Sequence, residues 1–329
     1  MIAIVISMIL IAGASATYIA QTRSYVAQES VSEVNTQSKI AHGLIADTLK
    51  SGGFGMPMDM SLDPINGYTS VVTQVDNFNA ADAITIVGGF RAIGTIWPVG
   101  GGPGMACPAS VTLGSKQITL VYSGTERFNL TDKRFISIDG VDFAVITNCT
   151  PDGNNDCTPS SITIDRSLTQ DFPLADTNGD GQCDSGRPVY LVEDVTFCVD
   201  AGSSLRRIRR NANVAACTGQ ASSDDEEIAQ NIEDLQFAYA MDADDNGQTD
   251  DMDGSGTINS ADFMNGIMVT DPDTIRAVRI NVLARADRAD PNFRAQGNPP
   301  AGIENRAHVP TNDDFRRRWW QTIVTMRNQ

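Results

Sequence analysis

Histidine is nearly absent from this chain of 329 residues, which contains only His42 and His308. So few histidines do not suggest a Ser–His–Asp arrangement, and no Cys–His pair typical of a thiol nucleophile is apparent. The cysteines are widely spread and form no CxxC pair, which together with the scarcity of histidine argues against zinc. We therefore expect no enzymatic activity, and an exported hydrolase is the weakest function considered.

Aromatic residues are also scarce, at 6% of the chain, whereas glycine (28 residues) and proline (14 residues) are frequent. This composition predicts many turns and short strands rather than a mostly helical protein. The net charge of −17 repels phosphate backbones, so we expect no nucleic-acid partner. The length and the 41% hydrophobic content are sufficient for one large domain or two small ones.

The number of cysteines is even, and six cysteines in an exported protein indicate up to three disulfides. We expect Cys198 to pair with Cys217 across a hairpin, and Cys149 to pair with Cys157 across a short loop.

Charge is missing from the first twenty residues, and the first charged side chain is Arg23. Twenty apolar residues in a helix span roughly 30 Å, the thickness of the apolar core of a bilayer. One interpretation is a cleaved signal peptide, for which Ala14-Ser15-Ala16 supplies an A-x-A pattern; the other is a retained helix. We favour the retained helix, because no basic segment precedes the apolar run and the helical pattern continues beyond it.

The segment from Gln21 to Lys50 contains no proline, and its apolar residues repeat on one helix face. Ser51-Gly52-Gly53 then ends the helix, as a glycine C-cap would. The predicted helix is apolar all round in its first half and amphipathic in its second. Its second half is expected to pack against a globular head. Its first half can leave a bilayer only if other copies replace the lipid.

Beyond Gly55 the sequence predicts a β-rich head, because alternation and β-branched residues mark a series of short strands. The candidate strands are 83–87, 117–122, 134–138, 142–146, 161–165, 188–199, 204–210, 235–241, 274–284 and 319–326. Asp139-Gly140 is a hairpin turn signal. Segments 60–115 and 242–270 are expected to be long insertions.

Three charged segments also need an interpretation. Arg206–Arg210 predicts either a surface for nucleic acid or an acidic neighbouring subunit, or an exposed edge strand blunted by charge. Ser222–Glu227 predicts the start of a short helix, with a hydroxyl cap followed by acids that complement the helix dipole. Arg316–Trp320 predicts either a contact patch or core tryptophans beside surface arginines.

The segment Asp242–Asp262 contains seven aspartates and neither lysine nor arginine. Residues 251–262 have the twelve-residue spacing in which a tight loop offers calcium oxygens from alternate positions. Gly256 takes the sixth place, at the bend. The predicted ligands are Asp251, Asp253, Ser255, Thr257 (through its carbonyl), Asn259 and Asp262.

Two further loops have related spacing. One offers Asp242, Asp244, Asn246, Gln248 and Asp250, followed by Asp253. The other offers Asp176, Asn178, Asp180, Gln182 and Asp184, but has Arg187 at the twelfth place, so closure must come from elsewhere.

Two questions about these loops stay open. The first two loops are compatible with one combined site or two adjacent sites, and all three are also compatible with solvated turns. Bound Ca²⁺ would be structural, because it would neutralise the carboxylates and fix each loop.

Stretches at both ends of the chain follow one family pattern. They are MIAIVISMILIAG, Gln21–Tyr25, Gly43–Gly55, Asn231–Tyr239, Ile275–Ile280, Phe315–Arg318 and Thr325–Asn328. This pattern resembles the minor type IV pilins of the PilW kind, and the loop 251–262 resembles dockerin and EF-hand loops. The resemblance implies an α+β, type IV pilin-like fold with a long N-terminal helix on an antiparallel β-sheet head that carries long loop insertions. Residues 1–55 would be membrane anchor and filament core, and residues 56–329 the head.

The sequence thus predicts a structural subunit of an extracellular type IV pilus-like or pseudopilus filament, which polymerises through its N-terminal helix. The expected partners are copies of itself or other pilins through residues 1–50, the inner membrane before assembly, and the pilus assembly machinery. We expect inner-membrane anchoring before assembly and a filament at the cell surface afterwards. The alternative is a membrane-anchored, calcium-dependent adhesin that does not polymerise.

Overall fold

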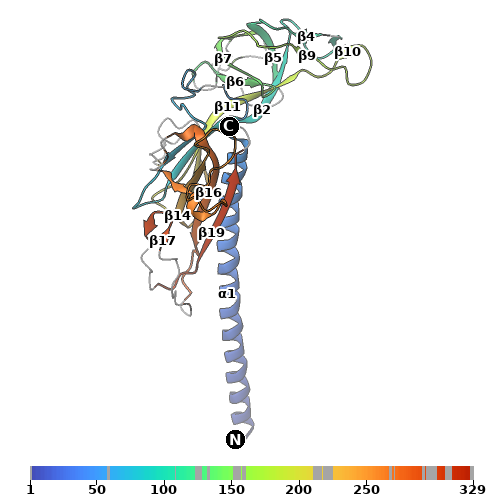
Figure 1. Cartoon of the computed structure of the whole chain (residues 1–329). Coiled ribbons are helices and arrows are strands. Elements are labelled where there is room, and N and C mark those ends of the chain that lie inside the picture. Colours follow the sequence, from blue (N-terminus) through green and yellow to red (C-terminus); the bar gives the residue numbers. More distant parts are fainter. Residues whose placement is uncertain are drawn as a thin grey trace.

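The computed structural model describes residues 2–57, 60–107, 109–122, 128–131, 134–150, 157, 161–209, 217, 225–266, 269, 271–290, 293, 302–307 and 313–326. One helix, α1 (Ile2–Ser51), leads into a body made mostly of strands (Figure 1). The helix ends where the sequence predicts. The N–H of Gly52 donates to the carbonyl of Leu49 at 3.1 Å, and Gly53 has a φ of 76°, a left-handed conformation that favours glycine.

The part of the body farthest from the N-terminus is a closed, antiparallel, six-stranded barrel (Figure 1). Its strands, in spatial order, are β2 (Ala83–Trp97), β5 (Gln117–Tyr122), β8 (Ser161–Ile164), β7 (Asp142–Asn148), β6 (Phe135–Ile138) and β11 (Arg187–Val199). The pairing of β11 with β2 closes the barrel. Alternate side chains of these strands fill the interior with an apolar core that includes Ile118, Ile136, Ile146 and Ile162.

Short strand pairs decorate the barrel. They are β3 (Met105–Ala106) with β10 (Gln182–Cys183), and β4 (Ser110–Val111) with β9 (Phe172–Pro173).

The two longest barrel strands continue into a second region. There β2 also pairs with β1 (Val72–Val75), and β11 pairs with β12 (Leu205–Arg209), which pairs in turn with β13 (Asp225–Ala229). A separate sheet has the order β15 (Met264–Asn265), β14 (Ile232–Met241), β16 (Ile275–Arg285), β19 (Arg317–Thr325). Two short 3₁₀ helices, η1 (Ser260–Asp262) and η3 (Pro272–Thr274), and a small hairpin of β17 (Gly302–Ile303) and β18 (Arg306–Ala307) complete this region.

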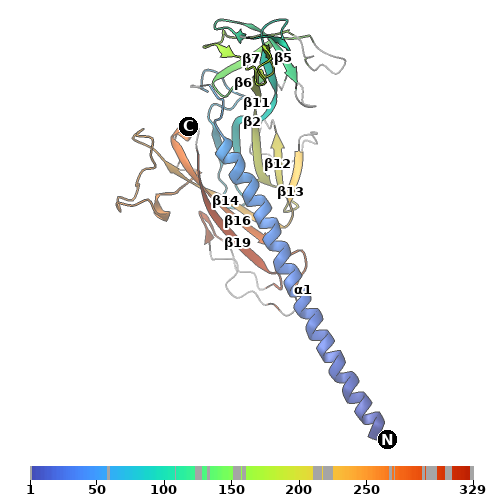
Figure 2. The same cartoon turned by 90° about the vertical axis from the view of Figure 1, so that its right-hand side faces the viewer.

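The C-terminal half of α1 lies between these two sheets, with β12 and β13 on one side and β14, β16 and β19 on the other (Figure 2). Ala41, Ile45 and Leu49 are fully buried there, in a core shared with strands of both sheets. The N-terminal half of α1 projects away from the body (Figure 1).

The expected α+β, pilin-like fold is wrong. The body is mostly β, and its largest sheet closes into a barrel instead of forming an open sheet for the helix to pack on. The segment 60–115 is no peripheral insertion, because it contains β2, which pairs with β1, β5 and β11. Alternation shows which residues of a strand face a core but not which strand is its neighbour.

Each predicted strand has a counterpart in the structure, with bounds that differ at some ends. The Asp139-Gly140 turn joins β6 to β7, and both residues have positive φ, at 55° and 73°. Among the described residues no helix is both long enough and apolar enough to cross a membrane.

Two interpretations of charged segments are also wrong. Asp225–Glu227 lie in a strand rather than in a helix, whereas residues 222–224 lie outside the described residues. The arginine strand β12 is not an edge, because Arg206 pairs with Asp225 and Arg207 pairs with Glu226 across β12 and β13. These cross-strand ion pairs favour a strand over the predicted helix.

The segment Arg316–Trp320 does not have the expected arrangement, in which tryptophans lie in the core beside arginines on the surface. Trp319 is exposed, whereas the Arg317 side chain is buried and pairs with Glu233 at 2.6 Å and with Asp313 at 2.5 Å.

The attachment of α1 to the body can be tested by shortening a buried side chain. We expect Ile45→Ala to lower the free energy of unfolding by about 2–5 kcal/mol, because it leaves a cavity between two sheets. Ile40→Ala on the same helix is the matched control, since Ile40 is 46% exposed, and its effect should stay within about 0.5 kcal/mol. Urea unfolding at one pH measures the free energy of unfolding of both variants. Equal losses of stability would contradict the packing of Ile45 between the sheets.

A buried carboxylate predicts how stability changes with pH. Burial raises the pKa of Asp82 to about 7, and the carboxylates of Asp76 and Asp234 add to this, although the N–H groups of Phe237 and Asn77 oppose it. The folded protein therefore holds this proton more tightly than the unfolded chain does. The contribution of Asp82 to the free energy of unfolding is fully present below about pH 4. It decreases as the pH rises to about 7, by at most about 4 kcal/mol.

We expect Asp82→Asn to weaken this decline, measured as the difference in free energy of unfolding between pH 4.5 and pH 7.5. Asp287→Asn, at an exposed position, should retain the wild-type decline. An unchanged decline in Asp82→Asn would contradict the assignment.

Candidate metal-binding loops

The three Asp-rich loops share one backbone arrangement. In each, the first carboxylate accepts a hydrogen bond from the N–H of the glycine at the sixth position, and that glycine has a positive φ. The pairs are Asp176 with Gly181 (φ 84°), Asp242 with Gly247 (φ 82°) and Asp251 with Gly256 (φ 83°). The predicted bend is therefore present in all three loops.

In the loop Asp251–Asp262, oxygen atoms converge on a single point. The Asn259 amide nitrogen donates to Asp253 Oδ2 at 3.0 Å, to Ser255 Oγ at 2.9 Å and to the Thr257 carbonyl at 3.2 Å. These acceptors belong to the predicted ligands at the third, fifth and seventh positions of the loop. The amide nitrogen therefore lies among three of the predicted ligand oxygens, and hard oxygens of this kind fit Ca²⁺.

The carboxylates of this loop also lie close to one another. One oxygen from each of Asp251, Asp253 and Asp262 lies within 4.8 Å of the others. Asp262 is fully buried, and its two oxygens accept the N–H groups of Asp253 at 3.1 Å and Asn259 at 2.6 Å. Asn259 also caps the helix η1 through Ala261, so the loop is closed by local hydrogen bonds.

Local hydrogen bonds also set the charge of this loop. Donation from the Asn259 side chain and from the Ser255 backbone and side chain lowers the pKa of Asp253 to about 2. The carboxylate is therefore ionised at neutral pH, which is the form that binds a metal ion.

The loop Asp242–Asp250 gathers a second cluster, made of Asp242, Asp244 and Asp250. Asn246 donates its backbone N–H to Asp242 at 2.9 Å and its amide to Asp244 at 3.0 Å, and accepts the N–H of Gln248 at 2.8 Å. Among the described residues, Asp253 groups with the first cluster and not with this one. The acids of these two loops therefore form two separate groups in the structure.

The spacing of the acids does not indicate that an arginine enters this second cluster. Arg276 of β16 donates to Asp242 at 3.1 Å. Burial raises the pKa of Asp242, but the N–H groups of Gly247 and Asn246 together with Arg276 outweigh it and hold the pKa below its ordinary value. Arg276 already neutralises the first ligand, so a cation gains less here than at Asp251–Asp262.

The loop Asp176–Asp184 gathers no comparable group of three acids among the described residues. Asp184 instead accepts hydrogen bonds from the backbone and hydroxyl of Thr177, at 3.0 and 2.9 Å. Asn178 donates its amide to Asp180 at 3.3 Å and to Asp184 at 3.4 Å, and Asp180 accepts the N–H of Gln182 at 2.7 Å. Hydrogen bonds between its own residues thus close this loop.

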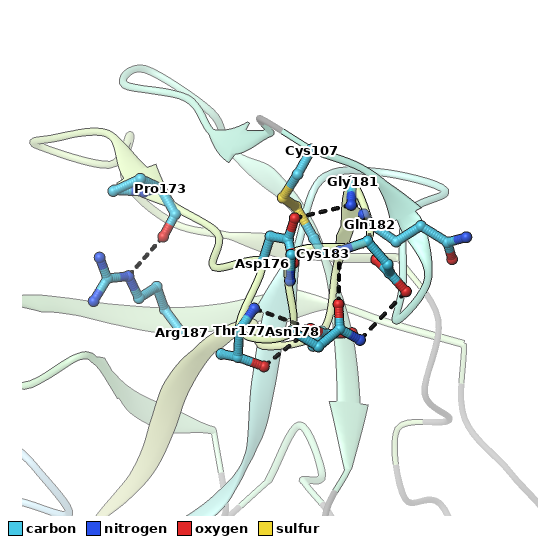
Figure 3. The surroundings of a disulfide bond; sticks show 12 residues. Cys107, Pro173, Asp176, Thr177, Asn178, Gly181, Gln182, Cys183 and Arg187 are labelled. Atoms are coloured by element: carbon cyan, nitrogen blue, oxygen red, sulfur yellow. Dashed lines mark hydrogen bonds between the residues drawn. A yellow bond between two sulfur atoms is a disulfide. The ribbon is translucent and has the colours of Figure 1, made fainter.

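Arg187, at the twelfth position of that loop, is directed toward the carbonyl of Pro173, to which it donates at 2.8 Å (Figure 3). A disulfide between Cys107 and Cys183 ties the loop to β3 (Figure 3). The sequence did not predict this pairing, because 76 residues separate the two cysteines. The two predicted disulfides, Cys149–Cys157 and Cys198–Cys217, are confirmed.

The left-handed glycine of the best loop provides a test of its geometry. A Cβ at Gly256 meets nothing within 4 Å, so Gly256→Ala costs only backbone strain. We expect it to lower the free energy of unfolding by about 1 kcal/mol. Gly43→Ala is the control: its Cβ also meets open space, but it lies inside α1 and should raise stability by about 0.5–1 kcal/mol. Effects of the same sign in thermal unfolding would contradict this geometry.

Comparison with known proteins finds a family match in the second half of the chain. Residues 189–328 match the family model described as Type IV Pilus-assembly protein W, whereas no curated protein and no solved structure matches the chain. The matched range includes the later segments on which the predicted resemblance rests, and it contains both clusters between Asp242 and Asp262. The match supports a type IV pilus-associated family, involvement in pilus assembly, and a location in the cell envelope or at the cell surface.

Proposed function

We propose that this chain is a structural subunit of an extracellular type IV pilus-like or pseudopilus filament, that it polymerises through the N-terminal half of α1, and that calcium stabilises its body. The family match supports a role in pilus assembly. The observation that carries the filament role is the exposed apolar half of α1, because water is an unfavourable environment for such a surface.

The arrangement of these apolar side chains favours several partners rather than one. Met8, Ile9, Leu10 and Ile11 are consecutive, and each is at least 65% exposed. Successive residues of a helix point about 100° apart, so these four side chains face nearly every direction around the axis. One docking surface covers one side only, whereas a bundle of copies of the same helix covers all sides. We therefore favour copies of this chain as the partner.

The two halves of α1 then have separate roles. The second half is anchored through Ala41, Ile45 and Leu49 in the core between the sheets, so the body is held rigidly on the helix. Packing of the first halves would place the bodies on the outside of the filament.

Calcium would act on the body and not on the polymer core. The residues that would hold it are Asp251, Asp253, Ser255, Thr257, Asn259 and Asp262, with a weaker site at Asp242, Asp244 and Asp250. Bound Ca²⁺ supplies positive charge that offsets the repulsion of the gathered carboxylates. Weak sites fill outside the cell, where extracellular modules commonly bind calcium with low affinity.

Filament formation is tested with material sheared from cells, by electron microscopy and by mass spectrometry that identifies this chain. We expect filaments in which α1 forms the core, and we expect Leu10→Asp to abolish them, because a charge would be buried among apolar helices. Ile40→Asp is the control, since Ile40 is exposed on the same helix beside the body.

Two outcomes would limit the proposal. Trace amounts of this chain beside a more abundant filament protein would indicate a minor subunit. A chain that remains monomeric in the membrane fraction would refute the filament role and favour an anchored, calcium-dependent adhesin.

The calcium role is tested by thermal unfolding of the full chain with calcium and with a chelator. We expect calcium at 100 times its dissociation constant to add about 2.7 kcal/mol of stability. Asp251→Asn should remove most of this increment. Asp245→Asn, which removes the same charge from an exposed neighbour outside both clusters, should retain it. Stability that does not change with calcium would eliminate this part of the proposal.

A further inference from the structure

A buried arginine of β16 contacts the best calcium loop without contacting its carboxylates. Arg279 donates to the Ser260 carbonyl at 3.0 Å and to the Ser260 hydroxyl at 2.7 Å, and its guanidinium carbon lies 4.7 Å from the centre of the Phe263 ring. Ser260 begins the turn η1 and Phe263 follows it, so Arg279 contacts the chain on both sides of Asp262. Asp262 is the last predicted ligand and is fully buried.

The same guanidinium holds the hairpin β17–β18 on the sheet. Arg279 Nε and Nη2 donate to the two carboxylate oxygens of Glu304, both at 2.7 Å, and Asn281 donates to Glu304 at 2.6 Å. Glu304 lies in the turn between β17 and β18. The side chains of Arg279 and Glu304 are 7% and 8% exposed, so this is a buried, bidentate ion pair.

Glu304 therefore balances the charge of Arg279, so this charge is not balanced by the acids of the loop. Arg276 binds Asp242 directly and competes with a cation for that carboxylate. Within the described residues, Arg279 contacts the carbonyl and hydroxyl of Ser260 and the ring of Phe263, and it pairs with none of the acids of this loop. It positions the loop without replacing the metal.

We propose that Arg279 is a positioning residue through which calcium bound at Asp251–Asp262 orders the hairpin Gly302–Ala307. The proposal rests on the calcium site proposed above. An ion at Asp262 holds the turn η1 in place, and the turn keeps the Ser260 carbonyl and the Phe263 ring on the guanidinium. Without the ion, the repelling carboxylates loosen the turn, and Arg279 loses contacts that keep its buried pair with Glu304 in one geometry. Because coupling is reciprocal, the docked hairpin strengthens calcium binding by the same factor.

Two measurements on the full chain, calcium titration and amide hydrogen exchange, test this coupling. Calorimetry gives the affinity for calcium, and mass spectrometry follows amide exchange in residues 302–307 with calcium and with a chelator. In the wild type we expect calcium to slow this exchange at least about fivefold. Arg279→Lys keeps the charge but loses the planar fork, so it should abolish the calcium dependence of exchange and weaken calcium binding about fivefold.

The matched control is Arg306→Lys. Arg306 pairs with the buried Asp234 at 2.5 Å and thereby also holds the hairpin, but within the described part of the chain it forms no hydrogen bond or ion pair with the loop Asp251–Asp262. This variant should speed exchange in both conditions and keep the calcium-dependent ratio. Ser260→Ala removes only the hydroxyl contact, and it should reduce the ratio in part even where Arg279→Lys fails to fold.

The outcomes separate the coupling from the calcium site itself. If the wild type binds calcium and exchange in residues 302–307 does not respond, the coupling is refuted and the site stands. If the wild type binds no calcium, the site and the coupling both fail.

Discussion

The long antiparallel pair of β2 with β11 is the constraint on which the rest of the body depends. It runs over eleven residue pairs, from Arg187 opposite Ile96 to Phe197 opposite Ile84. One end of this pair closes the barrel, and the other end forms the sheet that covers α1. Two register shifts within it bend the strands where one region passes into the other. A barrel and a helix-binding region are thus built on one pair of strands instead of being joined by a linker.

The helix shows how one element serves two environments. Its C-terminal half buries alanine, isoleucine and leucine between two sheets, whereas its N-terminal half exposes apolar side chains in every direction. The C-terminal half is covered by other parts of the same chain, whereas the N-terminal half is not. This difference, more than any single contact, is why we propose assembly with further copies.

Arginine side chains decide how the acidic loops differ. Arg276 neutralises the first ligand of one cluster directly, whereas Arg279 is neutralised by Glu304 and leaves the other cluster negative. Among the described residues, the third loop gathers no group of three acids, and Asp184 accepts hydrogen bonds from Thr177 and Asn178. Related spacing in the sequence therefore produces three loops with different electrostatic surroundings, because the neighbouring strand supplies part of the charge.

Features that depend on local interactions could be predicted from the amino-acid sequence alone. They are the end of α1 at the glycines, the Asp139-Gly140 turn, the cysteine pairs 8 and 19 residues apart, and the glycine bend of each Asp-rich loop. Features that depend on contacts between distant segments could not be predicted in this way: the barrel, the Cys107–Cys183 disulfide, the pairing of Arg207 with Glu226, and the approach of Arg276 and Arg279 to the loops. Turns and short loops depend on residues that are neighbours along the chain, whereas strand pairing and cross-strand charges depend on which distant segments meet. Alternation of side chains carries no information about that choice.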